Sequence, residues 1–288
     1  MIGRLPLVLA VAIATVGASV AAQQPTFSSR RESVRVDVLV TERGRPVGGL
    51  KASDFELLDA GVPQTIDLVS SGEFPVSVML AFDSSASITS LQLDHLREAG
   101  RAVLADLTQE DEAALLTFAD AVALRQPPTS NLAAVRAALD AVVPTEPSPN
   151  GGTALVNASY AALLLADADS RELLIAFTDG VDTSSWLGAR QVLDLARQSN
   201  VVAYVVSTSK LAGGSFARDL ADVTGGAAIE IGSTADLRTT FVGILEEFRQ
   251  RYLLSYSPVN VPNPGWHPLA VRVKGKRADV RARPGYVK

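Results

Sequence analysis

Short apolar runs alternate with stretches of helical periodicity through the middle of the chain. Residues 76–82, 173–177 and 201–206 are almost entirely apolar, which is typical of strands buried on both faces of a parallel sheet. Regular alternation with amphipathic stretches such as 91–107 predicts an α/β fold with a central, mostly parallel sheet. The other elements expected here are strands at 113–118 and 227–231, a short antiparallel partner at 121–124, and helices at 131–142, 154–166, 186–199, 216–223 and 235–249.

Both ends of the chain show a period of two instead. Valines occupy every second position from 34 to 40, and 251–256, 269–274 and 278–282 also alternate, as in half-buried strands. Further short strands are expected at 55–59 and 65–69, and a Pro-rich loop at 258–268. Each end therefore supplies about three short strands.

A sheet of three strands leaves one apolar face uncovered and is marginally stable alone. We therefore expect the two ends to pair into one small β-sandwich, formed by residues 23–73 and 251–288. The α/β domain, 74–250, is then inserted between the two parts of this sandwich.

Residues 1–22 have the pattern of a secretory signal peptide. A basic start is followed by the apolar stretch 5–16, and small residues at 20–22 precede Gln23. We expect cleavage after Ala22 and export to the periplasm or to the outside of the cell. An uncleaved membrane anchor is the alternative, because the stretch nearly reaches the roughly 20 residues of a bilayer span. No second segment is apolar and long enough to span a membrane.

Composition narrows the class of protein further. The 288 residues are 47% hydrophobic, which supports a sizeable core and argues against disorder. A formal net charge of -5 without a long basic block argues against nucleic-acid binding. Because the chain has no cysteine, disulfides, zinc–thiolate sites and thiol catalysis are excluded.

Polar side chains follow the first buried strand at a regular spacing. Asp83, Ser85 and Ser87 stand at i, i+2 and i+4 directly after the run 76–82. In open α/β sheets, ligands bind at the carboxyl ends of the strands. These side chains offer only oxygen atoms, which suits a hard cation such as Mg²⁺.

Two later segments extend this pattern. Thr153 follows Gly151-Gly152 and is expected to cap the helix at 154–166. Asp179 ends the buried run 173–178 and precedes a turn glycine. The fold should bring these residues to the same sheet edge as Asp83. Two carboxylates would then neutralise a dication, while neutral hydroxyls bind it loosely and leave room for an outside ligand.

This order of motifs resembles the metal-ion-dependent adhesion site of von Willebrand factor A domains. The resemblance covers roughly Phe74 to Gln250, and all five motif positions match. It implies a Rossmann-like domain in which Ser85, Ser87 and Thr153 ligate the metal directly, while Asp83 and Asp179 act through bound waters. It also implies that an acidic side chain of a partner protein fills the open coordination position. The segments 50–55 and 281–286 resemble those flanking the domain in a bacterial, exported subgroup.

The resulting hypothesis is an exported, non-enzymatic adhesion or binding module that uses Mg²⁺, with Mn²⁺ and Ca²⁺ as alternatives, to bind an acidic group on a protein. The main alternative is a Mg²⁺-dependent phosphatase or phosphotransferase with Asp83 as the nucleophile. The haloacid-dehalogenase-like pattern requires a second carboxylate two residues on, where this chain has Ser85. Ser85 itself lacks the Gly-x-Ser-x-Gly context of a nucleophile.

Several other residues have structural explanations. His95 and His267 are isolated in the sequence and do not form a zinc motif. Asp120 and Asp182 could tune the charge of the site, but turn and capping roles are the expected ones. Ser, Thr, Asp and Gly are also ordinary turn formers. The metal-site interpretation therefore depends on the three segments occurring together.

Overall fold

A computed structural model describes residues 33–72, 74–146, 151–167, 170–208, 214–262 and 264–287. The predicted signal peptide, its cleavage site and most of the loop before Gly151 lie outside these residues. Within the described ranges, no helix is both long and apolar enough to cross a membrane.

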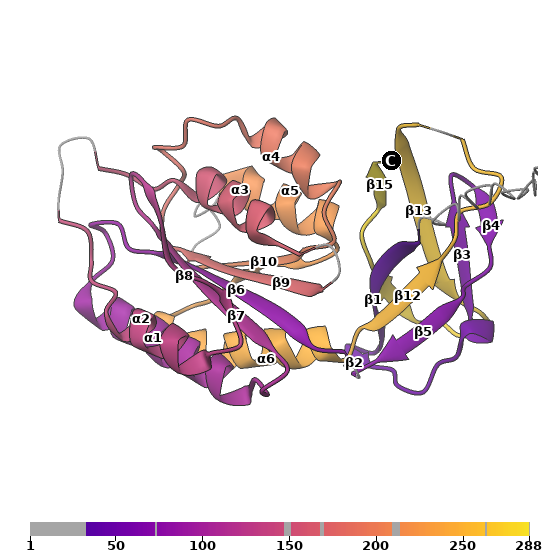
Figure 1. The fold of residues 1–288 in the computed structure, drawn as a ribbon, viewed down its shortest axis with the longest axis horizontal. Helices are drawn as coiled ribbons and strands as arrows, with labels where there is room; N and C mark the ends of the chain where they lie inside the picture. Colours follow the sequence, from indigo (N-terminus) through magenta and orange to yellow (C-terminus); the bar gives the residue numbers. More distant parts are fainter. Residues whose placement is uncertain are drawn as a thin grey trace, which may run out of the picture. The chain divides into compact units, whose positions relative to one another are not determined.

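A six-stranded sheet forms the centre of the α/β region, in the order β11-β10-β9-β6-β7-β8 (Figure 1). All neighbouring strands are parallel except β8, which runs antiparallel to β7. The predicted α/β class with a mostly parallel sheet is therefore confirmed. The strands are β6 (Val76–Asp83), β7 (Glu112–Phe118), β8 (Val122–Thr129), β9 (Arg171–Thr178), β10 (Val202–Ser207) and β11 (Ala227–Glu230).

Helices cover both faces of this sheet, with α1, α2 and α6 on one face and α3, α4 and α5 on the other (Figure 1). Two apolar clusters result, one on each face. The helices are α1 (Ser90–Asp106), α2 (Leu132–Asp140), α3 (Leu155–Leu165), α4 (Ala189–Ala196), α5 (Gly214–Thr224) and α6 (Leu237–Arg249), with a short 3₁₀ turn, η2 (Thr234–Asp236), before α6.

The continuous apolar run of β6 is explained by this double cover. Val78, Leu80 and Phe82 point into the cluster beneath α1 and α6. Met79 and Ala81 point into the cluster on the opposite face. Because successive side chains of a strand alternate between faces, a strand covered twice needs apolar residues at nearly every position, and Ser77 is the one polar residue between Val76 and Phe82.

The two ends of the chain build two further sheets together. One has the order β14-β1-β12-β5, with β2 paired to β1, and the other has the order β15-β13-β3-β4. Each combines strands from both ends, and one apolar cluster is shared between residues of both, including Val38, Leu57 and Tyr252. The elements are β1 (Val34–Glu42), β2 (Arg45–Pro46), η1 (Ala52–Asp54), β3 (Phe55–Asp59), β4 (Val62–Gln64), β5 (Leu68–Ser71), β12 (Tyr252–Tyr256), β13 (Trp266–Val273), β14 (Asp279–Arg281) and β15 (Gly285–Val287).

The strands next to the α/β region pair with each other. β5 leads into β6, β12 follows α6, and the two are antiparallel neighbours with Ser71 opposite Tyr252. The two ends thus fold together as a sandwich, and the α/β region is inserted between its neighbouring strands β5 and β12. The residue limits given above for the domains stay a prediction.

Several elements differ from their predicted limits. The strand expected at 65–69 lies at Leu68–Ser71 (β5), and an unpredicted short strand, β4, precedes it. β8 extends to Thr129 although it contains Pro127 and Pro128, because an edge strand tolerates a missing N–H donor. The helix expected from residue 186 begins only at Ala189, after Gly188, whose N–H donates to the Gln191 side chain at 3.0 Å. The expected Pro-rich loop ends early, because β13 already begins at Trp266, which pairs with Val287 of the unpredicted β15.

Buried charges join the sandwich to the α/β region. The Arg171 guanidinium lies 2.6 Å from the Asp37 carboxylate of β1, and both side chains are buried. Arg171 also donates to the Phe248 carbonyl at 3.1 Å. Arg251 is fully buried and donates to the Tyr204 hydroxyl and to the Gly225 carbonyl, each at 2.8 Å. Arg171 is paired from both sides, which offsets the cost of burying its charge. Arg251 bonds through Nη2 alone, and its Nε and Nη1 have no hydrogen-bond partner among the described residues.

Glu172, the residue after Arg171 in β9, is a buried carboxyl group. One oxygen accepts the Asp167 N–H at 3.0 Å, and the other has no hydrogen-bond partner among the residues that the structure describes. Burial raises the pKa of Glu172 to about 7. The negative charges of Asp167 and Glu112 also raise this pKa, and the hydrogen bonds to the carboxylate lower it. The folded protein therefore holds this proton more tightly than the unfolded chain does.

The Glu172→Gln substitution should stabilise the protein in a pH-dependent way. The free energy of unfolding of the native protein should fall as the pH rises from about 4.5 to about 7, because the buried carboxyl then has to ionise. Glutamine avoids this cost, so at pH 8 the variant should gain about 1–3 kcal/mol. Thermal unfolding at pH 5 and pH 8 checks this, with exposed Glu110→Gln as the control. The same gain at both pH values would contradict the ionisation argument.

Candidate metal centre

The loop from Asp83 to Thr89 is built by local hydrogen bonds. Asp83 ends β6, and its Oδ1 accepts the Ser85 N–H at 2.9 Å. The Ser84 N–H donates to the Phe118 carbonyl at 2.8 Å, which ties the loop to the end of β7. Buried Ile88 anchors the loop, and Thr89 caps α1 by accepting the Gln92 N–H at 3.2 Å. The backbone thereby holds the side chains of Ser85 and Ser87 at the edge of the sheet.

Parallel pairing of β6 with β9 brings the second carboxylate to this loop. Phe82 lies opposite Phe177, so the strands end side by side. The Thr178 hydroxyl donates to Asp83 Oδ2 at 2.8 Å. The Ser87 hydroxyl donates to Asp179 Oδ1 at 2.9 Å and lies 3.0 Å from Ser85 Oγ. Four of the five predicted residues are therefore joined in one hydrogen-bonded group.

Thr153 joins the same edge through the start of α3. A Cβ built on Gly180 would lie 3.3 Å from Thr153 Oγ1, so this hydroxyl lies beside the Asp179–Gly180 turn. The Thr153 carbonyl accepts the N–H groups of Thr183 and Ser184 at 2.9 and 3.1 Å. The structure thus gathers all five predicted residues at one edge of the sheet.

The expected capping role of Thr153 is wrong. The N-cap of α3 is Ala154, which makes no side-chain capping bond. The free N–H groups of the first turn are satisfied from a different loop instead. Val156 donates to Asp182 Oδ2 at 2.7 Å, and Asn157 donates to Ser185 Oγ at 3.0 Å. Asp182 therefore has the predicted capping role, and the Thr153 hydroxyl is left to face the site.

Burial differs across the group. Asp83, Ser85 and Thr153 are buried, Asp179 is half-buried and Ser87 is exposed. Burial raises the pKa of the Asp83 carboxyl above its ordinary value, and the charge of Asp179 acts in the same direction, while hydrogen bonds from Ser85 and Thr178 oppose the shift. The site is therefore closed beneath Asp83 and open to solvent at Ser87.

The donor set suits a small divalent cation. Neighbouring ligands of an octahedral Mg²⁺ with bonds of about 2.1 Å lie about 3 Å apart, and the Ser85–Ser87 and Ser87–Asp179 oxygens are 3.0 and 2.9 Å apart. No group of three or more His, Cys, Asp or Glu side chains within the described ranges could hold a metal. A cation at this edge would therefore depend on the hydroxyl groups as well as on the two carboxylates.

The two histidines lie apart from this group. The His95 Nδ1 lies 2.9 Å from Thr234 Oγ1. The buried His267 Nδ1 lies 3.0 Å from an oxygen of Asp59, whose other oxygen accepts the Tyr256 and Tyr286 hydroxyls. These contacts are local packing interactions within the fold.

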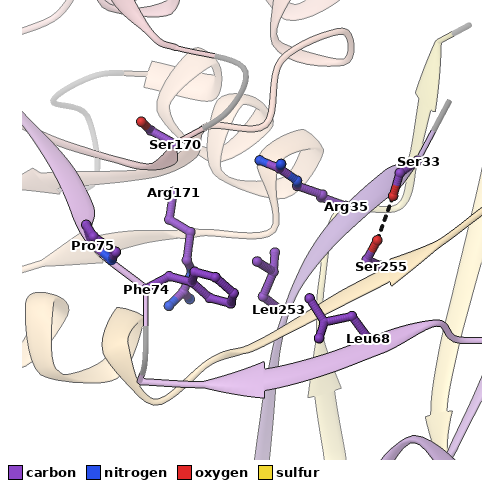
Figure 2. A pocket seen from close by; sticks show the side chains of 9 residues that line it. All are labelled: Ser33, Arg35, Leu68, Phe74, Pro75, Ser170, Arg171, Leu253 and Ser255. Carbon is purple, nitrogen blue, oxygen red and sulfur yellow. Dashed lines mark hydrogen bonds between the residues drawn. The ribbon is translucent and has the colours of Figure 1, made fainter. Parts of the chain in front are cut away.

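A pocket of about 350 Å³ lies near the opposite ends of β6 and β9 (Figure 2). Leu68, Phe74 and Leu253 form apolar parts of its wall, and Arg171 already pairs with Asp37. None of the five predicted site residues and no carboxylate lines it. We therefore assign this pocket no role in the candidate metal centre.

Comparisons with known proteins agree with this geometry. A model of the von Willebrand factor type A domain matches residues 78–182. No curated protein sequence matches the chain. A von Willebrand factor type A structure from Catenulispora acidiphila aligns with a TM-score of 0.52 at 13% identity, over 86% of this chain and 76% of that one.

A second solved structure is proximal thread matrix protein 1 from the mussel byssus, with a zinc-occupied MIDAS motif. It aligns with a TM-score of 0.54 at 17% identity, over 66% of this chain and 50% of that one. At such identities these two likenesses show the fold alone.

Gly152→Ala should disrupt the site without touching its oxygen atoms. A Cβ at Gly152 would overlap with the side chains of Thr183 and Ser184, which lie in the loop bound to the Thr153 carbonyl. We expect a loss of about 1–3 kcal/mol in the free energy of unfolding. Chemical denaturation checks this, with Gly232→Ala as the control because a Cβ there meets nothing within 4 Å. Equal stability of both variants would refute the close packing described here.

Proposed function

This chain belongs to the proteins that carry a von Willebrand factor type A domain, and on that premise we propose that it is an exported, non-enzymatic module that binds another protein through a divalent cation. The observation that carries the proposal is the hydrogen-bonded group of Ser85, Ser87 and Asp179 at the end of the parallel strands, which reaches solvent at Ser87. Asp83 and Thr153 complete it from beneath.

The five site residues have two different roles in this proposal. The hydroxyls of Ser85, Ser87 and Thr153 would ligate the cation directly, and Asp83 and Asp179 would act through water. Mg²⁺ is the proposed ion, and the zinc-occupied motif of the mussel protein supports a divalent cation at a site of this kind. When bound, the ion supplies a positive charge with an open position for a carboxylate of the partner protein.

The geometry of Asp83 supports binding over phosphoryl transfer. Its side chain has no exposed surface, and its two oxygens accept hydrogen bonds from the Ser85 N–H and the Thr178 hydroxyl. A nucleophile has to approach the substrate with a free oxygen. Asp83 would have to break one of these bonds and leave its buried position first.

Export is the part of the proposal that rests on the sequence of residues 1–22. If the signal is cleaved after Ala22, the mature protein recovered from expressing cells should begin at Gln23 and lie outside the cytoplasm. N-terminal sequencing after cell fractionation checks both statements. An intact Met1 on cytosolic protein would remove export from the proposal.

Metal binding is tested by calorimetry with Mg²⁺ and Mn²⁺ on the purified protein. We expect one site per chain, and we expect Asp179→Ala to weaken it by at least about tenfold, because each carboxylate offsets half of the ion's charge. Asp83→Asn tests the buried position with little change in volume. Asp219→Ala, an exposed carboxylate on α5, is the matched control.

Each outcome of this experiment has a clear meaning. Circular dichroism should show that all variants remain folded, since the apolar clusters supply most of the stability. Equal affinity of the Asp179→Ala and Asp219→Ala proteins would refute the assigned site. Hydrolysis of p-nitrophenyl phosphate that needs Mg²⁺ and is lost in Asp83→Asn would favour the phosphatase alternative.

A further inference from the structure

The three most exposed large apolar side chains of the described residues lie in segments that adjoin the loops of the candidate metal centre. Trp186, Leu91 and Val143 have exposed fractions of 80%, 64% and 62%, the three highest values in that set. Single exposed apolar residues are common on soluble proteins, whereas several of them next to one candidate site are a reason to consider a binding surface there.

Leu91 and Val143 lie next to loops of the site, and the position of Trp186 is described below. Leu91 lies in the first turn of α1, directly after the loop that carries Ser85 and Ser87. Val143 precedes Thr145, whose N–H donates to the Ser84 carbonyl at 2.7 Å. Val181, which follows Gly180, is 51% exposed as well. We call Leu91, Val143, Val181 and Trp186 the apolar rim.

Trp186 is held in place although its side chain is in solvent. The preceding residue, Ser185, accepts the Asn157 N–H and donates to Asp182 at 2.7 Å. The N–H of the following residue, Leu187, donates to the Asn157 side chain at 3.2 Å. An aromatic side chain on a fixed backbone loses little freedom when a partner covers it, and tryptophan is enriched among the residues that dominate binding energy.

The loop places Trp186 close to the proposed cation. Ser184 donates its N–H to the Thr153 carbonyl at 3.1 Å, and two residues further on the Cα of Trp186 lies within about 8 Å of the Cα of Ser184. A partner segment in extended form advances about 3.3 Å per residue. A few residues of one extended segment would therefore be long enough to place a carboxylate on the ion and an apolar side chain on Trp186, and we expect a separation of about two to four residues.

We propose that the apolar rim and the metal centre form one recognition surface, whose partner is a protein segment with an acidic side chain flanked by apolar side chains. This inference rests on the proposed function, because the ion supplies the contact for the acidic group. The rim then determines which acidic segments bind. A segment with charged side chains only would bind the ion but would make no apolar contact with the rim.

A peptide library with a central aspartate and randomised flanks tests the proposal. The immobilised protein is probed in Mg²⁺ and in chelator, as wild type, Trp186→Ser and Leu164→Ser. Leu164 is a matched control, because it is 61% exposed on α3 and lies near the end of that helix remote from Thr153. Both substitutions remove exposed surface only, so the fold should be unchanged.

We expect Mg²⁺-dependent selection of peptides with apolar residues two to four positions from the aspartate. Against the selected peptides, Trp186→Ser should bind about 10- to 30-fold more weakly and Leu164→Ser as the wild type does. Selection of aspartate peptides without apolar preference, or an equal affinity of Trp186→Ser and wild type, would overturn the rim while leaving the metal-dependent module in place. Failure of all Mg²⁺-dependent selection, in a protein that binds Mg²⁺ by calorimetry, would overturn both the rim and the partner-binding role.

Discussion

The parallel pairing of β6 with β9 is the constraint on which the candidate site depends. It places the end of each strand beside the other, so that Asp83 meets the Thr178 hydroxyl and Ser87 meets Asp179. The pairing itself is fixed by burial, since both strands lie between two layers of helices. A shift of the register by one residue would move every side chain of a strand to the other face. The same packing that stabilises the sheet thus holds the polar residues together at its edge.

Much of the fold and the five residues of the site could be predicted from the sequence, because the signals are local. Runs such as 173–177 are apolar at every position, and the carboxylates follow these runs directly. The contacts that organise the site could not be predicted in the same way. Thr178, Thr183 and Ser185 contribute through hydrogen bonds to residues about 28 to 95 positions away. Their side chains are ordinary turn formers, and only the approach of distant loops gives them a role.

Errors in the predicted elements have the same origin. The sequence pattern predicts Trp186 inside a helix, but the helix begins at Ala189, and Ser185 in the loop before it accepts an N–H from the first turn of α3. Prolines in β8 are compatible with a strand only because β8 lies at the edge of its sheet. In each case the decisive information is the position of the segment relative to neighbours distant in the sequence.

The pairing of β5 with β12 has a mechanical consequence. The chain enters the α/β region after β5 and leaves it before β12, and these strands are hydrogen-bonded to each other from Ser71–Tyr252 onward. A tension applied at β1 and β15 is therefore carried by the strands of the sandwich, and it reaches β6 or α6 only after β5 and β12 have separated. While the pairing of β5 with β12 holds, a force on the sandwich does not act on the loops of the metal site. The geometry at Ser85, Ser87 and Asp179 would then stay the same under tension.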